Sequence, residues 1–165
     1  GTAAGVTRNQ DIFTRDGISS LINSTEGVLF LEMAALDNES VYRAISLNDS
    51  SSTNTLRIGY SSDATNQLFM EFIVGTVTQS NDWYAVDVTV SHKIAVKWKV
   101  NDIAIWLDGT EIHTDTSASV PAADTLNQLS FNNGTAATHQ FRGKVKQLQV
   151  YKTALSDAQL TSLTT

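Results

Sequence analysis

The sequence predicts an all-β domain made of two antiparallel sheets packed as a sandwich, with a short C-terminal helix. Charged residues make up 17% of the chain, below the usual ~25%, and Ser, Thr and Asn are abundant. Apolar and polar residues alternate in short runs, and polar turn-forming clusters separate these runs at intervals of roughly 8–12 residues. Short alternating strands joined by frequent turns are typical of a β-sandwich or barrel.

Length and charge narrow the class of protein further. A chain of 165 residues suits one domain with a substantial core, since a domain of about 150 residues buries roughly 70% of its unfolded surface. The formal net charge of −6 disfavours nucleic acid, whose phosphates require a basic surface, and permits neutral ligands such as sugars. The lack of cysteine excludes disulfides and thiolate metal sites. Without a run of about 18 apolar residues, we predict no membrane insertion.

The first half of the chain gives a lead-in, a turn of helix and a series of strands. Residues 1–10 are small and polar and are expected to be a linker or a cloning remnant, which leaves 11–165 as a single domain cut from a longer protein. Residues 11–14 predict an edge strand and residues 16–23 a helical turn. The nearly all-apolar run 28–35 suits a strand covered on both faces. Further strands are expected at 42–47, 56–60, 68–74 and 83–90.

The alternation is clearest between residues 92 and 113. Ile94, Val96 and Trp98 share one face of a strand, and Lys93 and Lys97 lie on the other, which predicts a core side and a solvent side.

The next strand repeats the pattern and leads to the chain's end. Ile103 and Ile105 are expected to point inward and Trp106 to the opposite face. Asp108 and Gly109 form a hairpin turn, because glycine readily adopts positive φ. Strands follow at 126–131 and 145–151. Ser156 is expected to cap a helix whose inward residues are Ala158, Leu160 and Leu163.

The closing segment carries a family resemblance. It contains Gly143, Val145, Leu148, Val150, Tyr151, Ala154, Leu155, Ser156, Asp157 and Leu160. This pattern resembles the laminin-G-like branch of the concanavalin A-like lectin/glucanase superfamily. Residues 26–32 and 43–47 are similar to versions of this fold in bacteriophage tail and fibre proteins. The resemblance implies a jelly roll of two antiparallel sheets, one of them curved, whose concave face or rim loops bind glycans in relatives.

Catalysis is not expected. Glucanases of this superfamily carry Glu-x-Asp-x-Glu on a single strand, and retaining glycosidases hold two carboxyl groups about 5–5.5 Å apart. The sequence has no such motif. Glu32 and Asp37 differ by five positions, which places them on opposite faces of a strand, and Glu71 stands alone. The three histidines lie in no hydrolase or zinc-protease motif.

Exposed aromatic residues with planar polar neighbours are the candidates for binding. A flat aromatic ring packs against the axial C–H groups of a sugar, and amides or guanidinium groups bind its hydroxyls. The candidate residues are Trp106, Trp83, Tyr60, Arg57, Asn132 and Asn133. Packing in the core or at a strand edge is the alternative for each aromatic residue, and the composition of turns is the alternative for the polar ones.

No cofactor is expected, and calcium is the one metal considered. Hard cations prefer oxygen ligands, and Asp102, Asp108, Asn132 and Asn133 lie in turns that could supply them. No spacing distinguishes these residues from ordinary turn residues.

Three functional hypotheses follow. The first is a non-catalytic, lectin-like carbohydrate-binding domain that recognises host glycans as part of a phage tail or virion protein. The second is a carbohydrate-binding module of a bacterial polysaccharide-degrading enzyme. The third is a structural spacer or oligomerisation domain without a ligand. The expected partner is a glycan or polysaccharide, with a homo-oligomer as a further expectation, and the expected location is the virion or the extracellular space.

Overall fold

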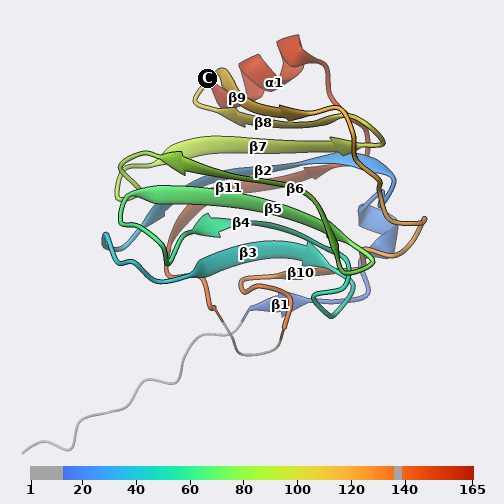
Figure 1. Ribbon diagram of the computed structural model, residues 1–165, viewed down its shortest axis with the longest axis horizontal. Helices are drawn as coiled ribbons and strands as arrows, with labels where there is room; N and C mark the ends of the chain where they lie inside the picture. The colour runs from blue at the N-terminus through green and yellow to red at the C-terminus, as the bar shows by residue number, and fades with distance from the viewer. Residues whose placement is uncertain (1–12, 136–138) are drawn as a thin grey trace, which may run out of the picture.

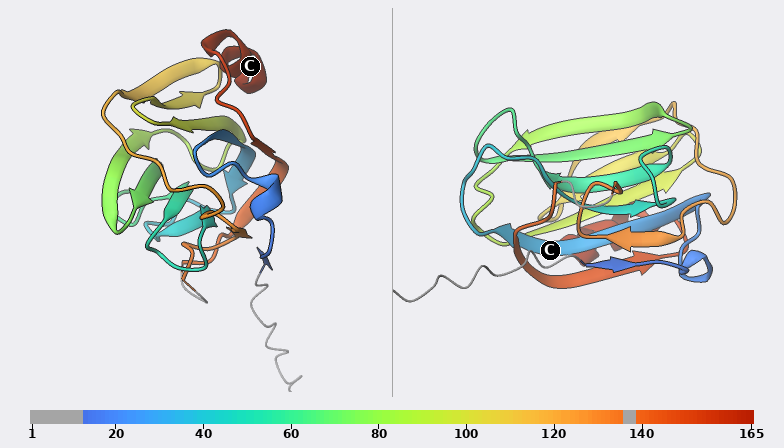
Figure 2. Two further views of the ribbon diagram at one scale, coloured as in Figure 1. Left: turned by 90° about the vertical axis from the view of Figure 1, so that its right-hand side faces the viewer. Right: turned by 90° about the horizontal axis from the view of Figure 1, so that it is seen from below.

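A computed structural model describes residues 13–135 and 139–165 of the chain. Two antiparallel sheets lie face to face (Figures 1 and 2). Sheet A has the strand order β1-β10-β3-β4-β5-β6, and sheet B the order β11-β2-β7-β8-β9. The strands of sheet A are β1 (Thr14–Arg15), β10 (Gln128–Ser130), β3 (Arg43–Asn48), β4 (Thr55–Tyr60), β5 (Gln67–Val74) and β6 (Val77–Ala85). Those of sheet B are β11 (Gly143–Tyr151), β2 (Glu26–Ala35), β7 (His92–Lys99), β8 (Ile103–Leu107) and β9 (Thr110–Asp115).

The predicted jelly-roll sandwich is therefore confirmed, together with most of its strands. The expected helical turn is a short 3₁₀ helix at Ser19–Leu21, and β2 is covered on both faces as its apolar run predicted. The N-terminal edge strand was expected at residues 11–14. Residues 11 and 12 lie outside the described residues, as does the expected linker 1–10, and β1 is Thr14–Arg15. No helix among the described residues is long and apolar enough to cross a membrane.

The main core lies between the two sheets. Leu56 and Ile58 of β4 enter it from sheet A, and Ile94, Val96 and Trp98 of β7 enter it from sheet B. These residues alternate with others that face outward, as the strand period requires. The inward residues predicted for β7 and β8 are confirmed.

A second, smaller core lies on the outer face of sheet B. The C-terminal helix α1 (Asp157–Thr164) covers this face, and Figure 1 shows it lying over β8 and β9. The residues buried there are Val28, Phe30, Ala95, Ala104, Trp106 and Leu160. The solvent side predicted for β7 was therefore wrong, because the alternation of one strand does not reveal a helix that packs on it later. Lys97 is buried on this face and pairs with Asp102 at 2.7 Å.

The helix begins where the sequence predicts. The side chain of Ser156 accepts a hydrogen bond from the backbone N–H of Gln159, and the Gln159 side chain bonds back to the Ser156 backbone N–H, so the two form a capping box. Leu160 is buried and Leu163 packs against the second core, but Ala158 is exposed, contrary to expectation.

The strand expected at residues 83–90 lies earlier, at Val77–Ala85. Gly75 and Thr76 both have positive φ and form a tight turn, so β6 pairs with β5 from its first residue. After Ala85 the chain leaves the sheet, and Asp87 holds a turn by accepting hydrogen bonds from the backbone and hydroxyl of Thr89. After Ala85, Val86 and Val88 still pack in the main core, but from a segment that is not a strand.

Candidate functional site

No helix in the described part of the chain covers the outer face of sheet A. In the left view of Figure 2, β5 and β6 (green) lie at the left edge of the molecule, and α1 (dark red) lies at the top right. The pairing register aligns a row of outward polar side chains across five strands. From β10 to β6 this polar row consists of Ser130, Ser46, Arg57, Glu71 and Asn81.

An ion pair lies at the centre of the polar row. Arg57 Nη1 donates a hydrogen bond to Glu71 Oε2 at 3.0 Å, with the two side chains 11% and 25% exposed. The same nitrogen lies 3.4 Å from the hydroxyl of Tyr42. Burial raises the pKa of Tyr42 above its ordinary value, with Arg57 acting to lower it and Glu71 to raise it. The site therefore holds a donor, an acceptor and a neutral phenol within one short stretch of sheet.

Some buried polar atoms on this face have no partner among the described residues. Thr55 Oγ1 and Arg57 Nε are buried and make no hydrogen bond within the described residues. Leaving a buried polar group unpaired costs about 1–3 kcal/mol. The outer face is therefore not optimised for stability alone, a feature common at functional sites.

Aromatic rings form a second row beside the polar one. Tyr42 stacks on Phe69, with ring centroids 4.7 Å apart and planes at 27°. His139 meets Tyr42 edge-on at 4.4 Å. Phe69 is paired in register with Trp83 on β6. Trp83 is 47% exposed and lies at the open end of this aromatic row.

A network of small polar side chains anchors the other end of the polar row. Ser46 Oγ donates to the backbone oxygen of Asn132 at 2.8 Å, and Asn48 Nδ2 donates to the hydroxyls of Ser46 and Ser130. This network ties the segment after β10 to β3. It gives the ion pair a rigid neighbour on one side.

The predicted site residues Asn132 and Asn133 lie in that segment. Asn132 Oδ1 accepts a hydrogen bond from the backbone N–H of Gly134 at 2.8 Å. The Asn133 amide donates to the His139 ring nitrogen Nδ1 at 2.9 Å. The Asn132 side chain thus stabilises the loop itself, the Asn132 backbone oxygen joins the loop to Ser46 of the polar row, and Asn133 reaches the aromatic row through His139.

Two other predicted site residues lie elsewhere. Trp106 is 8% exposed and packs beneath α1 on sheet B. Tyr60 is 4% exposed and belongs to the core between the sheets, where burial raises the pKa of its hydroxyl. The structure therefore brings Trp83, Arg57, Asn132 and Asn133 to one face and separates Trp106 and Tyr60 from them. Ligand binding by the four that remain stays a prediction.

Sequence reasoning missed Glu71, Tyr42 and Asn81. A signal was present, because Arg57 lies between Leu56 and Ile58 as the single charge of an apolar strand. Glu71 has the same setting between two apolar neighbours. Charges on the outward phase of two adjacent strands are expected to pair, but the register needed to see this depends on distant segments.

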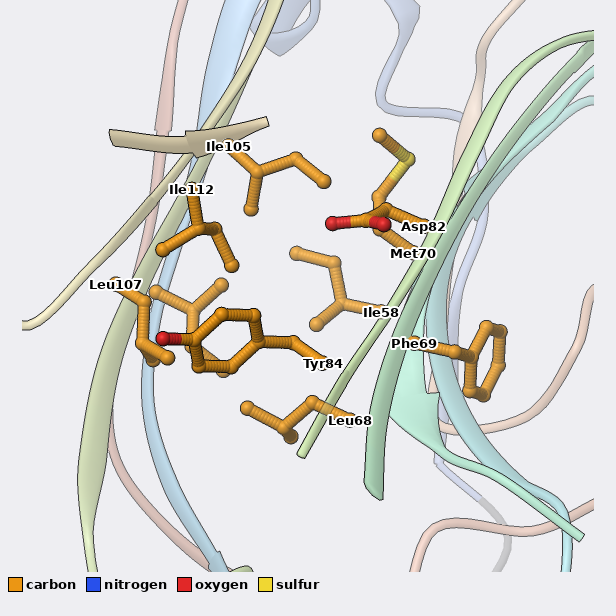
Figure 3. Close-up of a pocket in the computed structure, with 10 residues that line it drawn as sticks. Ile58, Leu68, Phe69, Met70, Asp82, Tyr84, Ile105, Leu107 and Ile112 are labelled. Atoms are coloured by element: carbon orange, nitrogen blue, oxygen red, sulfur yellow. The ribbon is translucent and has the colours of Figure 1, made fainter. Parts of the chain in front are cut away.

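The cavity between the sheets is not a comparable site. It measures about 20 Å³ and is lined mostly by apolar side chains. This is room for about one water molecule and not for a sugar ring. Figure 3 shows Asp82 and Tyr84 of β6 pointing into it, whereas Phe69 points away. His113 of β9 closes the nearby edge, with Nε2 3.0 Å from Ser80 Oγ.

The calcium candidates are occupied by other contacts. Asp102 pairs with Lys97, and Asp108 contacts His92 and the backbone N–H of Lys93. In the part of the chain that the structure describes, no group of three or more His, Cys, Asp or Glu residues is placed to hold a metal ion.

Comparison with known families agrees with this architecture. The family model described as the concanavalin A-like lectin/glucanases superfamily matches residues 30–161. The chain belongs to this superfamily, as the closing sequence motif indicated. No curated protein sequence matches the chain.

Several solved structures share the fold at low sequence identity. The CBM40 of the Ruminococcus gnavus IT-sialidase, bound to alpha2,3 sialyllactose, has a TM-score of 0.70 and 18% identity over 90% of this chain and 86% of that chain. Domain 4 of AbnA, a GH43 extracellular arabinanase from Geobacillus stearothermophilus in complex with arabinotriose, has a TM-score of 0.66 and 11% identity over 97% and 84%. A SAP-like pentraxin from Limulus polyphemus has a TM-score of 0.62 and 12% identity over 98% and 79%.

Proposed function

We propose that this domain binds carbohydrate without catalysis, through the outer face of sheet A. The observation that carries the proposal is the partly buried pair of Arg57 and Glu71 beside the exposed ring of Trp83. An ion pair in such a position is weak evidence for stability, since desolvation offsets much of the attraction. A flat ring next to fixed donors and acceptors suits a sugar, which presents both C–H groups and hydroxyls.

The fold relatives support the same proposal. The CBM40 of the sialidase and the arabinanase domain are both carbohydrate-binding domains with bound oligosaccharides. At 11–18% identity they support the fold and no individual contact. The contacts proposed for this chain rest on its own residues.

The arrangement of acids favours binding over hydrolysis. On the outer face formed by the described strands β3 to β6, Glu71 is the one carboxylate, and its partner is Arg57. Glycosidases use two carboxyl groups on either side of the scissile bond, one of them protonated. A single carboxylate paired with a guanidinium fits a recognition site.

Two settings are proposed for the domain. The fold relatives favour a module of a secreted bacterial polysaccharide-degrading enzyme, because two of them are parts of glycan-degrading enzymes and the arabinanase is extracellular. The resemblance of residues 26–32 and 43–47 to phage tail and fibre proteins favours the receptor-binding part of a virion protein. In either setting the domain belongs to a longer protein and meets its glycan outside the cell.

A glycan array with wild type and two variants tests the proposal. Trp83→Ala removes the exposed ring of the aromatic row and is expected to weaken binding about tenfold, which corresponds to about 1.4 kcal/mol. Tyr84→Ala is the matched control, because this exposed neighbour on β6 points to the other face. Binding unaffected by Trp83→Ala would exclude this face. A folded wild type that binds no glycan on the array would favour the spacer hypothesis.

A further inference from the structure

We propose that the outer face of sheet A selects neutral over anionic carbohydrate, and that Glu71 is the residue that sets this selection. The inference rests on the proposed function, since it names the class of glycan that the same face accepts. It follows from the balance and the exposure of the charges on that face.

The charges on this face cancel. Arg57 and Glu71 are the two charged side chains that the described strands β3 to β6 direct outward. They pair at 3.0 Å, so neither is left as a free charge. Binding a carboxylate usually requires an arginine or lysine whose positive charge is not already matched. Here the only outward guanidinium of these strands is already matched.

The acidic partner is the more accessible of the two. The Glu71 side chain is 25% exposed and the Arg57 side chain 11% exposed. A ligand approaching the polar row therefore meets a carboxylate before it meets the guanidinium. An anionic sugar would need Arg57 to turn away from Glu71, and this would leave a partly buried carboxylate unpaired.

A neutral sugar can bind without Arg57 turning away from Glu71. The free lone pairs of Glu71 accept hydrogen bonds from sugar hydroxyls while its bond to Arg57 remains. Asn81, the exposed neighbour of Glu71 in the polar row, offers both a donor and an acceptor. Trp83 supplies an apolar surface for the ring. Hydroxyl recognition by a carboxylate, an amide and an indole uses no net charge.

The charge of the whole chain acts in the same direction. The net charge of −6 gives a negative field that repels anionic ligands at low salt. This long-range repulsion is screened over about 10 Å at 0.1 M salt. The short-range effect of Glu71 is screened much less because the pair is partly buried.

The experiment compares matched neutral and carboxylated glycans on one array. The pairs are hexose polymers with their hexuronate counterparts, and lactosides with and without terminal sialic acid. The measured quantity is the ratio of neutral to anionic binding for each pair. Wild type is expected to favour the neutral member, and Glu71→Gln is expected to reduce that ratio at least about fivefold, because it leaves Arg57 with a free positive charge.

Glu32→Gln is the matched control. Glu32 lies on β2 in sheet B, where it pairs with Lys146 at 3.5 Å, so this variant changes the net charge equally but away from the site. It is expected to leave the ratio unchanged. The ratio of the wild type is measured in the same way at low and high salt, so the inference is tested even if Glu71→Gln fails to fold.

The outcomes separate the two proposals. A wild type that binds carboxylated glycans more tightly than neutral ones overturns the selection and leaves carbohydrate binding in place. Equal ratios of neutral to anionic binding for Glu71→Gln and Glu32→Gln would also overturn the selection and leave carbohydrate binding in place. A folded wild type that binds neither class overturns carbohydrate binding itself, and the selection with it.

Discussion

Arg57 and Glu71 give the outer face of sheet A its chemistry, and they also make a prediction about stability. Arg57→Met leaves Glu71 partly buried without its partner and is expected to cost about 2 kcal/mol in the free energy of unfolding. The double variant Arg57→Met/Glu71→Leu removes both charges and is expected to lie within about 1 kcal/mol of wild type. Urea denaturation measures both values. Equal destabilisation by the single and double variants would mean that the ion pair itself stabilises the fold.

Trp106 and Trp83 are expected to have different roles, Trp106 in stability and Trp83 in glycan binding. Trp106 packs beneath α1, so Trp106→Ala leaves a cavity in the second core and is expected to cost about 3–5 kcal/mol. Glycan affinity per folded molecule is expected to be unchanged. Denaturation and binding, measured on the same sample below its melting temperature, check both parts. Loss of glycan affinity in a folded Trp106→Ala sample would show that Trp106 takes part in glycan binding.

Asp49 gives a prediction about acid stability. Burial would raise its pKa, but hydrogen bonds from Ser51 and Asn54 outweigh this and lower it below the ordinary value of 3.8. A carboxylate with a lowered pKa stabilises the fold above its unfolded pKa, and the effect is lost as the pH falls through the folded pKa. Asp49→Asn is therefore expected to cost about 1 kcal/mol at neutral pH.

The pH dependence is the check on this explanation. The difference in unfolding free energy between wild type and Asp49→Asn is expected to shrink as the pH falls below 3.8 and through the folded pKa, and to vanish once the carboxylate is protonated in both states. Denaturant titrations at a series of pH values measure it. A difference that does not change with pH would show that the charge of Asp49 is not involved.

Among the helices and strands, α1 is expected to contribute the most to stability for its length. It is eight residues long and is held by its capping box and by Leu160. Ser156→Ala is expected to cost about 1 kcal/mol through loss of the cap. Leu160→Ala is expected to cost about 2–5 kcal/mol through the cavity it leaves. Thermal or urea denaturation measures both, and equal losses would show that packing contributes no more than the cap.

The strands show what the sequence predicts well. The pattern of Ile103, Ile105 and Trp106 assigned the two faces of β8 correctly, because the side-chain period of a strand is a local property. The same pattern could not show that α1 covers the face of Trp106. Contact between an element at the chain's end and a strand many residues earlier is set by the fold.

The site was predicted in part for the same reason. Tyr60 was a binding candidate, but it follows Leu56 and Ile58 in phase, so local alternation alone would have placed it in the core, where the structure has it. Glu71 was different, because its role depends on the register of β4 against β5. Single-strand patterns locate outward charges, but only the paired sheet shows which charges meet.

At the scale of the whole molecule, the two sheets have unequal outer faces. In sheet B the strands β2, β7 and β8 are buried on both sides, between the main core and the second core under α1, and β2 is accordingly almost entirely apolar. The outer face of sheet A carries the polar and aromatic rows, and no helix among the described residues covers it. The family membership predicts this fold, and the residues of that one face carry the proposed function.

The central claim is that carbohydrate binds to the outer face of sheet A. A chain of 17.9 kDa permits a direct measurement, in which backbone amide NMR signals are followed as a neutral oligosaccharide found on the array is added. The largest shifts are predicted in β4, β5 and β6, around Arg57, Glu71 and Trp83. Shifts confined to β11, to α1 or to the cavity between the sheets would contradict the claim.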